Sequence, residues 1–245
     1  LGNRVYNDGQ VYTIMPDDWI DEAYRTAMRQ EYNLNINGGG SQGTFFASLG
    51  YLNADGIAVA SDYERFTARL KSTYQATKWL NVGGNISFAR SIANNGADVS
   101  DTEDSGNNNI YSQIVQMGPI YPVYLRDGEG NILRNENGVV GDFGDGQLLG
   151  SDYVRPYLTQ VNGIVDATLN TNKKITTTFS LNGFADIDIW DGLKATVNGS
   201  VYSSNYNSTY TYEPFYGFGH ASYPNGYVYK DSYNEYTINL QQLLK

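Results

Sequence analysis

The chain has 245 residues, a formal net charge of -10 and no cysteine. The absence of cysteine excludes disulfide bonds and thiolate metal sites. The acidic charge and the lack of a run of Lys and Arg argue against nucleic acid as a partner, because phosphate binding needs clustered cations. A helical membrane protein is excluded as well, since no stretch approaches the roughly 20 apolar residues that a spanning helix requires.

Residues 1–29 predict a loop with one short helix that leads into the rest of the chain. Asp17 or Asp18 can cap this helix, because a short acidic side chain accepts hydrogen bonds from the first helical N–H groups. The apolar positions Trp19, Ile20, Ala23, Tyr24 and Ala27 fall near helical spacing. We expect the helix to end around Arg29.

Residues 30–245 contain seven stretches in which apolar and polar residues alternate with a period of two. In the clearest one, Leu80, Val82, Gly84, Ile86 and Phe88 point one way, and Asn81, Gly83, Asn85, Ser87 and Ala89 point the other. This pattern predicts an all-β, antiparallel segment of a transmembrane β-barrel. Arg65, Arg69 and Lys71 share the polar face of another stretch, and each would cost about 2–4 kcal/mol in mid-membrane hydrocarbon. The polar face must therefore line the lumen.

Short and long connections alternate between these stretches. In chain order they are marked by residues 38–43, 53–56, 75–78, 92–174, 190–192 and 206–231. In outer-membrane barrels the short turns face the periplasm and the long loops face outward, so 92–174 and 206–231 are expected to be extracellular. Trp79 and Trp190 flank short turns, as an aromatic girdle at the lipid headgroups would. The alternative is that they are ordinary strand-end aromatics in a soluble sandwich.

Several longer stretches follow one another in a characteristic order. They are DWIDEAYRTA (18–27), YNLNINGG (32–39), FASLGYLNADGI (46–57), SDYERFTARL (61–70), KWLNVG (78–83) and GPIYPVY (118–124). In this order they resemble the SusC/RagA family of TonB-dependent outer-membrane transporters of Bacteroidetes. The resemblance implies a barrel of about 22 strands closed by a plug domain, of which this chain would be an internal slice.

The same resemblance implies a location and partners. The protein is expected in the outer membrane of a Gram-negative bacterium, where it would import oligosaccharides, other nutrients or peptides together with a SusD-like surface lipoprotein. Energy would come through TonB, contacted by parts that this chain lacks. The alternative is a stand-alone carbohydrate-binding or adhesive β protein without transport, and the strict apolar face argues against it.

Aromatic residues are dense between residues 206 and 233, where the only histidine, His220, also lies. The candidate ligand-binding residues are Tyr210, Tyr212, Phe215, Tyr216, Phe218 and Tyr223, all expected in a loop. Aromatic faces stack on sugar rings or hold peptide side chains, and phenol hydroxyls form hydrogen bonds. The alternative for each is packing within the loop or against a partner.

Acidic residues of the long loop form the other candidate cluster. They are Asp98, Asp101, Glu103, Asp104, Asp127, Glu129, Asp142 and Asp145. Their spacing does not match a calcium-binding loop, so we expect a solvated acidic surface and assign no metal ligands; the alternative is a calcium site built from closely spaced carboxylates. Residues 127–131 and 136–138 predict the turns of a small hairpin, with Ile132 and Leu133 between them.

No constellation for catalysis is visible. A single histidine, no cysteine and no nucleophile elbow leave no acid, base or nucleophile that could be assigned. We therefore expect neither an enzyme nor a cofactor.

Overall fold

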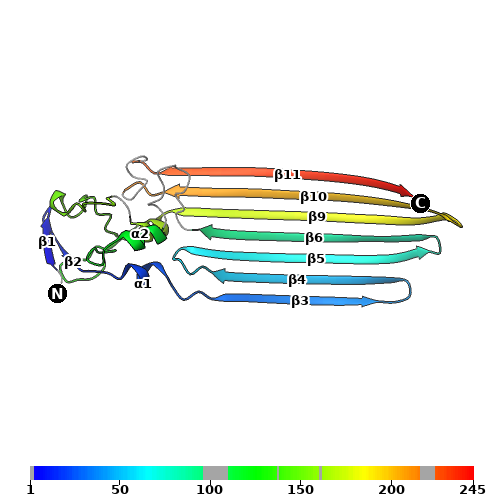
Figure 1. Ribbon diagram of the computed structural model, residues 1–245, viewed down its shortest axis with the longest axis horizontal. Coiled ribbons are helices and arrows are strands. Elements are labelled where there is room, and N and C mark those ends of the chain that lie inside the picture. The colour runs from blue at the N-terminus through cyan, green and yellow to red at the C-terminus, as the bar shows by residue number, and fades with distance from the viewer. Residues whose placement is uncertain (1–2, 96–109, 137, 160–161, 216–223) are drawn as a thin grey trace.

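A seven-stranded antiparallel sheet dominates the computed structural model (Figure 1), which describes residues 3–95, 110–136, 138–159, 162–215 and 224–245. The strands are β3 (Arg29–Gly39), β4 (Gly43–Asp55), β5 (Ser61–Thr77), β6 (Leu80–Asn95), β9 (Thr171–Trp190), β10 (Leu193–Tyr212) and β11 (Tyr227–Leu244). Their order across the sheet is β11-β10-β9-β6-β5-β4-β3, so each strand pairs with the next one along the chain. The predicted antiparallel all-β fold is confirmed.

The pairing register gathers the apolar side chains on one side of the sheet, here called the outward face. One row across the seven strands is Leu34, Leu49, Ala68, Phe88, Phe179, Ser203 and Tyr236. The next row is Ile36, Ala47, Leu70, Ile86, Leu181, Val201 and Ile238. Residues directly opposite each other in an antiparallel pair share a face, so these rows form one continuous apolar surface.

The other side, here called the inward face, is polar. One of its rows is Asn37, Phe46, Lys71, Asn85, Asn182, Ser200 and Asn239. Arg69 lies on the same face, and its Nε donates to Asn85 Oδ1 at 2.8 Å. Asn182, Asn198, Asn239 and Gln241 help to line an open hollow of about 580 Å³. The face that the sequence assigned to the lumen is thus rich in amides and cations.

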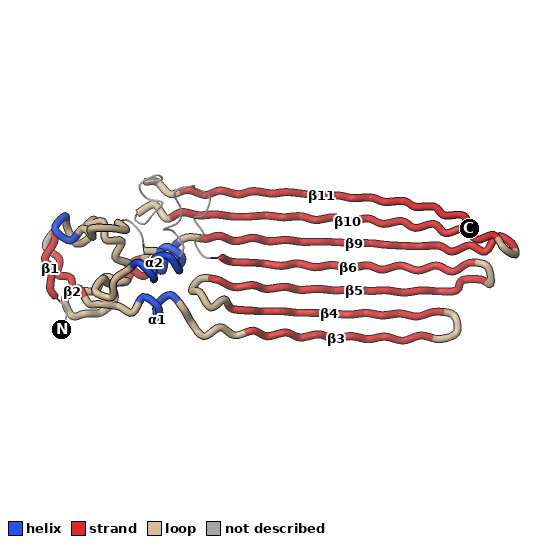
Figure 2. Tube along the Cα trace, in the orientation of Figure 1, coloured by secondary structure: helices blue, strands red, loops and turns tan. Residues whose placement is uncertain are grey.

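The connections sort to opposite ends of the sheet (Figure 2). Residues 40–42, 78–79 and 191–192 make tight turns at one end, and the long connections lie at the other. Gly192 has φ +87°, which suits the two-residue turn after Trp190. The long loops are shorter than predicted, spanning 96–170 and 213–226 instead of 92–174 and 206–231. The first loop is shorter because β6 and β9 pair as far as Asn94 opposite Lys173. The second loop is shorter because β10 and β11 pair as far as Tyr212 opposite Tyr227.

A folded unit, here called the cap, stands at the long-loop end of the sheet and comprises the described parts of residues 3–28 and 110–170 (Figure 1). It contains β1 (Asn3–Asn7), β2 (Gln10–Ile14), α1 (Trp19–Ala23), α2 (Ile110–Gln116), β7 (Arg134–Asn135), β8 (Gly138–Val139), the 3-10 helix η2 (Ser151–Tyr153) and α3 (Gly163–Leu169). Its buried core is Trp19, Ala23, Met117, Val123, Phe143, Ile164 and Val165. The N-terminal segment therefore packs on the long loop between β6 and β9, which the sequence did not predict.

The short helix α1 forms where it was expected but ends early. Asp18 is its N-cap and accepts hydrogen bonds from the N–H groups of Ile20 and Asp21 at 3.0 and 3.3 Å. The helix stops at Ala23, not near Arg29, because the following backbone pairs with the β4–β5 loop: the N–H of Arg25 donates to Ile57 O at 2.8 Å. Within the described ranges, no helix has the length and apolar character needed to cross a membrane.

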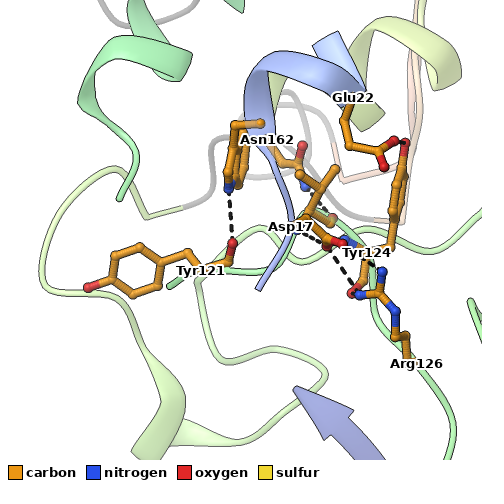
Figure 3. A network of polar contacts seen from close by, with 8 residues as sticks. Asp17, Glu22, Tyr121, Tyr124, Arg126 and Asn162 are labelled. Atoms are coloured by element: carbon orange, nitrogen blue, oxygen red, sulfur yellow. Dashed lines mark hydrogen bonds and ion pairs between the residues drawn. The ribbon is translucent and has the colours of Figure 1, made fainter. Parts of the chain in front are cut away.

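A nearly buried ion pair joins the two segments of the cap (Figure 3). Arg126 Nη2 lies 2.6 Å from Asp17 Oδ1, and the side chains of Arg126 and Asp17 are 11% and 7% exposed. Asp17 Oδ2 also accepts the backbone N–H of Val123 at 2.7 Å. The carboxylate is therefore well satisfied in a region with little water.

Further hydrogen bonds hold the same junction. Trp19 Nε1 donates to Tyr121 O at 2.9 Å, and Tyr124 Oη donates to Glu22 Oε2 at 2.8 Å. Burial, aided by the Glu22 carboxylate, raises the pKa of Tyr124 well above its usual range, so the phenol remains a donor. Asn162 Nδ2 donates to Val123 O at 2.8 Å, so the loop before α3 is tied to the same strand-like segment.

The predicted hairpin within the long loop is present. Asp127 O accepts the N–H of Gly130 at 3.0 Å in the first turn, and Arg134 pairs with Val139 across β7 and β8. Asn137, in the second turn, lies outside the described residues.

The two faces of β10 should differ sharply in their tolerance of charge. We expect Val197→Arg, on the outward face, to lower the free energy of unfolding by about 2–4 kcal/mol, because the guanidinium would lie in hydrocarbon. Asn198→Arg, one residue further on the inward face, is the matched control and should assemble normally. Denaturant unfolding of the protein in lipid vesicles measures both, and equal losses would contradict the face assignment.

The cap should depend on its ion pair. Asp17→Ala leaves Arg126 nearly buried without its carboxylate, and we expect a local loss of about 3–5 kcal/mol. Hydrogen exchange at the N–H groups of Val123 and Tyr124 would measure it, since Asp17 accepts both. Asp21→Ala is the control, because among the described residues no side-chain contact of Asp21 crosses the junction. Unchanged protection in Asp17→Ala would show that the pair does not hold the cap.

Candidate ligand-binding surface

Tyrosines line the inward face of β10 and β11 at the end of the sheet nearest the cap. Three of them lie on β10 and face three on β11 across the pair: Tyr206 opposite Tyr233, Tyr210 opposite Tyr229, and Tyr212 opposite Tyr227. We call these six residues the tyrosine ladder. On β10 the residues between them that point to the other face are Asn207, Thr209 and Thr211, and tyrosine and threonine both favour extended backbone.

Four of the six rings, those of Tyr210, Tyr212, Tyr227 and Tyr229, lie against one another. The ring centroids of Tyr210 and Tyr229 are 6.1 Å apart, and those of Tyr212 and Tyr227 are also 6.1 Å apart, with interplanar angles of 48° and 41°. Tyr227 and Tyr229 stack at 6.5 Å with an interplanar angle of 10°. Such pairs contribute about 0.5–1.5 kcal/mol beyond the area they bury. These four rings thus hold one another in place, while Tyr229 keeps 44% of its surface exposed.

Polar groups accompany the rings on the neighbouring strand. Asn172 of β9 pairs with Tyr210 and is only 3% exposed. Its side-chain oxygen is buried and accepts no hydrogen bond from any described residue. Ser208, between Tyr206 and Tyr210 on the same face, is also buried. Aromatic faces next to amide and hydroxyl groups suit ligands that are themselves part apolar and part hydrogen-bonding.

The structure divides the predicted aromatic residues into three groups. Tyr210 and Tyr212 lie in strand β10, so their predicted place in a loop is wrong. Phe215 follows the strand and is exposed, and its carbonyl accepts Gln147 Nε2 at 3.2 Å. Tyr216, Phe218, Tyr223 and His220 lie outside the described residues. Ligand binding by any of these residues stays a prediction.

Sequence reasoning did not select the β11 half of the ladder. Tyr227, Tyr229 and Tyr233 were visible as aromatics, but the sequence alone gave no register that set them opposite β10. The period of two that continues through Tyr206, Ser208, Tyr210 and Tyr212 was the signal that the strand runs on.

The acidic residues of the cap serve local structure. Asp127 Oδ1 accepts the backbone N–H groups of Glu129 and Asn131 at 3.0 and 2.9 Å, and the hydrogen bonds from Asn131 lower the pKa of Asp127. Asp142 accepts the N–H of Gly144 at 3.0 Å, while burial raises the pKa of Asp142. Across the described ranges, no three acidic or histidine side chains gather in a way that could hold a metal ion. Asp98, Asp101, Glu103 and Asp104 fall in residues 96–109, which are not described.

Comparison with known proteins identifies relatives of one kind. No family model matches the chain. It is 25% identical over 202 residues to TonB-dependent receptor P3 of Formosa agariphila, covering 82% of this chain and 18% of that protein. It is 41% identical over 51 residues to TonB-dependent receptor SusC of Bacteroides thetaiotaomicron, covering 21% of this chain and 5% of that protein.

Solved structures show the same fold. The RagAB peptide importer in its closed-closed state matches with a TM-score of 0.70 and 20% identity, over 100% of this chain and 24% of that chain. The open-open state matches with a TM-score of 0.68 and 18% identity over the same shares. The chain thus spans about a fifth to a quarter of the length of the relatives that it matches along most of its own length.

Proposed function

We propose that this chain, which belongs to the SusC/RagA family of TonB-dependent outer-membrane receptors, forms part of an importer and contacts the imported ligand through the tyrosine ladder. The observation that carries this proposal is the position of the ladder. Its rings face the lumen side of the sheet, at the end where the cap and the long loops meet. A ligand that enters from the long-loop side would pass the cap and then reach these rings.

The ligand class follows from the chemistry of that surface. Tyrosine faces and the amides of the inward face suit an oligosaccharide or a peptide, because both combine apolar patches with many hydrogen-bonding groups. The similar RagAB structures are described as those of a peptide importer, which supports a peptide. The parallel rings of Tyr227 and Tyr229 leave an oligosaccharide as the other candidate, because aromatic faces stack on sugar rings.

The proposed importer also needs a partner lipoprotein and a source of energy for transport. A SusD-like surface lipoprotein would cover the cap end of the sheet, and TonB would act through other parts of the importer. The relatives are named receptors and importers, and none of them is named an enzyme.

A stand-alone adhesive or carbohydrate-binding protein fits the structure less well. The outward face exposes Leu34, Leu49, Leu70, Ile86, Leu181 and Ile238 along with many other large apolar residues. A water-soluble protein rarely leaves so large an apolar surface uncovered, whereas lipid covers it without cost.

The proposal is tested by comparing two tyrosines of β11. In the intact receptor that carries this chain, we expect Tyr229→Ala to weaken ligand binding by about tenfold, because a stacked ring contributes on the order of 1–2 kcal/mol. Tyr236→Ala, on the outward face of the same strand, should bind normally. Binding of labelled oligosaccharides and of labelled peptides to purified receptor, measured in parallel, also decides the ligand class. Equal affinity of the two variants for every bound ligand would reject the ladder as the contact surface.

A further inference from the structure

A carboxylate interrupts the row of tyrosines on the inward face of β11. Asp231 lies between Tyr229 and Tyr233 at two-residue spacing, so all three side chains point to the same side of the strand. Residues two apart on a strand are separated by roughly 7 Å. Asp231 therefore has one aromatic side chain beside it toward the cap and another beside it away from the cap.

The neighbouring strands bring no cation next to this carboxylate. Asp231 faces Ser208 across the β10–β11 pair, and Lys174 of β9 follows only beyond Ser208 in the same row. Two strand spacings separate Lys174 from Asp231 by about 10 Å, which is too far for an ion pair. Within the part of the chain that the structure describes, Asp231 takes part in no ion pair, and no hydrogen bond reaches its carboxylate.

The same three side chains are open to a ligand. Tyr229 and Tyr233 keep 44% and 60% of their surface exposed, and Asp231 is exposed as well. The ring of Tyr229 contacts Tyr210 on β10 and Tyr227 on the side toward the cap. Both contacts lie on sides away from Asp231, so they hold the Tyr229 ring in place and leave the space between this ring and the carboxylate free of them.

A carboxylate with an aromatic ring on each side is suited to a cation. An ammonium or guanidinium group is attracted to an aromatic face within about 6 Å of the ring centroid, and it donates charge-assisted hydrogen bonds to a carboxylate. A neutral sugar gains neither interaction. Lysine and arginine side chains also have an apolar stem that packs along a ring while the charged end reaches an acceptor.

We propose that Asp231, Tyr229 and Tyr233 form a subsite for a lysine or arginine side chain of an imported peptide, a role that rests on the function proposed above and names the part of the ligand that is recognised. The stem of the basic side chain packs on the two rings, and its charged end donates hydrogen bonds to Asp231. Peptides with basic residues are thereby bound in preference to neutral peptides and neutral oligosaccharides.

Binding of two synthetic peptides to the intact, detergent-purified receptor tests this subsite. One peptide carries lysines, and the other has the same sequence with glutamine at each lysine position. We expect the lysine peptide to bind about tenfold more tightly, because a hydrogen bond between charged groups stabilises a complex more than a neutral one does. Asp231→Asn should weaken binding of the lysine peptide to the level of the glutamine peptide.

Two further comparisons separate the charge from its position and the ring from its bulk. Asp188→Asn is the matched control, because Asp188 is an exposed carboxylate on the same inward face but lies at the turn end of β9. It removes the same charge and should keep the preference for the lysine peptide. Tyr233→Phe keeps an aromatic face and should keep this preference, whereas Tyr233→Leu should reduce it by roughly threefold.

Failure of the subsite is distinguishable from failure of the tyrosine ladder. Equal affinity of the two peptides, with Tyr229→Ala still weakening the binding of both, would overturn the subsite and retain the ladder. Equal effects of Asp231→Asn and Asp188→Asn, or binding of oligosaccharides without binding of either peptide, would overturn the subsite in the same way. A Tyr229→Ala variant that binds every ligand normally would reject the ladder and the subsite together.

Discussion

The hydrogen-bond register of the seven strands is the constraint on which the other features depend. Side chains alternate between faces, so a slip of one residue in any pair would send a whole strand's apolar residues into the lumen. With the register fixed, each strand contributes to the same rows. The membrane surface, the amide-rich inward face and the tyrosine ladder are three results of that one arrangement.

The molecule is stabilised by two different environments. The sheet buries little of its apolar surface within the described protein, so its outward residues depend on lipid. The cap instead has an ordinary protein core around Trp19, Phe143 and Ile164, closed by the ion pair of Asp17 and Arg126. The cap stands beside the end of the sheet that carries the ladder (Figure 1), so it forms a wall next to the proposed ligand-binding surface.

The period of two was enough to predict the sheet, its two faces and the sense of its connections, since each depends on local alternation and turn residues. It placed Arg65, Arg69 and Lys71 correctly on the inward face. The cap could not be predicted, because it depends on contacts such as Trp19 with Tyr121 that lie 102 residues apart. For the candidate site, local pattern identified aromatic residues, but only the register of β10 against β11 showed which of them face one another.

The ion pair of the cap also bears on the order in which the chain acquires its structure. Asp17 and Arg126 are 109 residues apart, and the strands β3 to β6 lie between them in sequence. Bringing these ends together costs chain entropy, and that cost falls once the two hairpins have formed and shortened the path. We therefore expect the cap to close late, so that a protected Val123 amide would signal that the first four strands of the sheet have already paired.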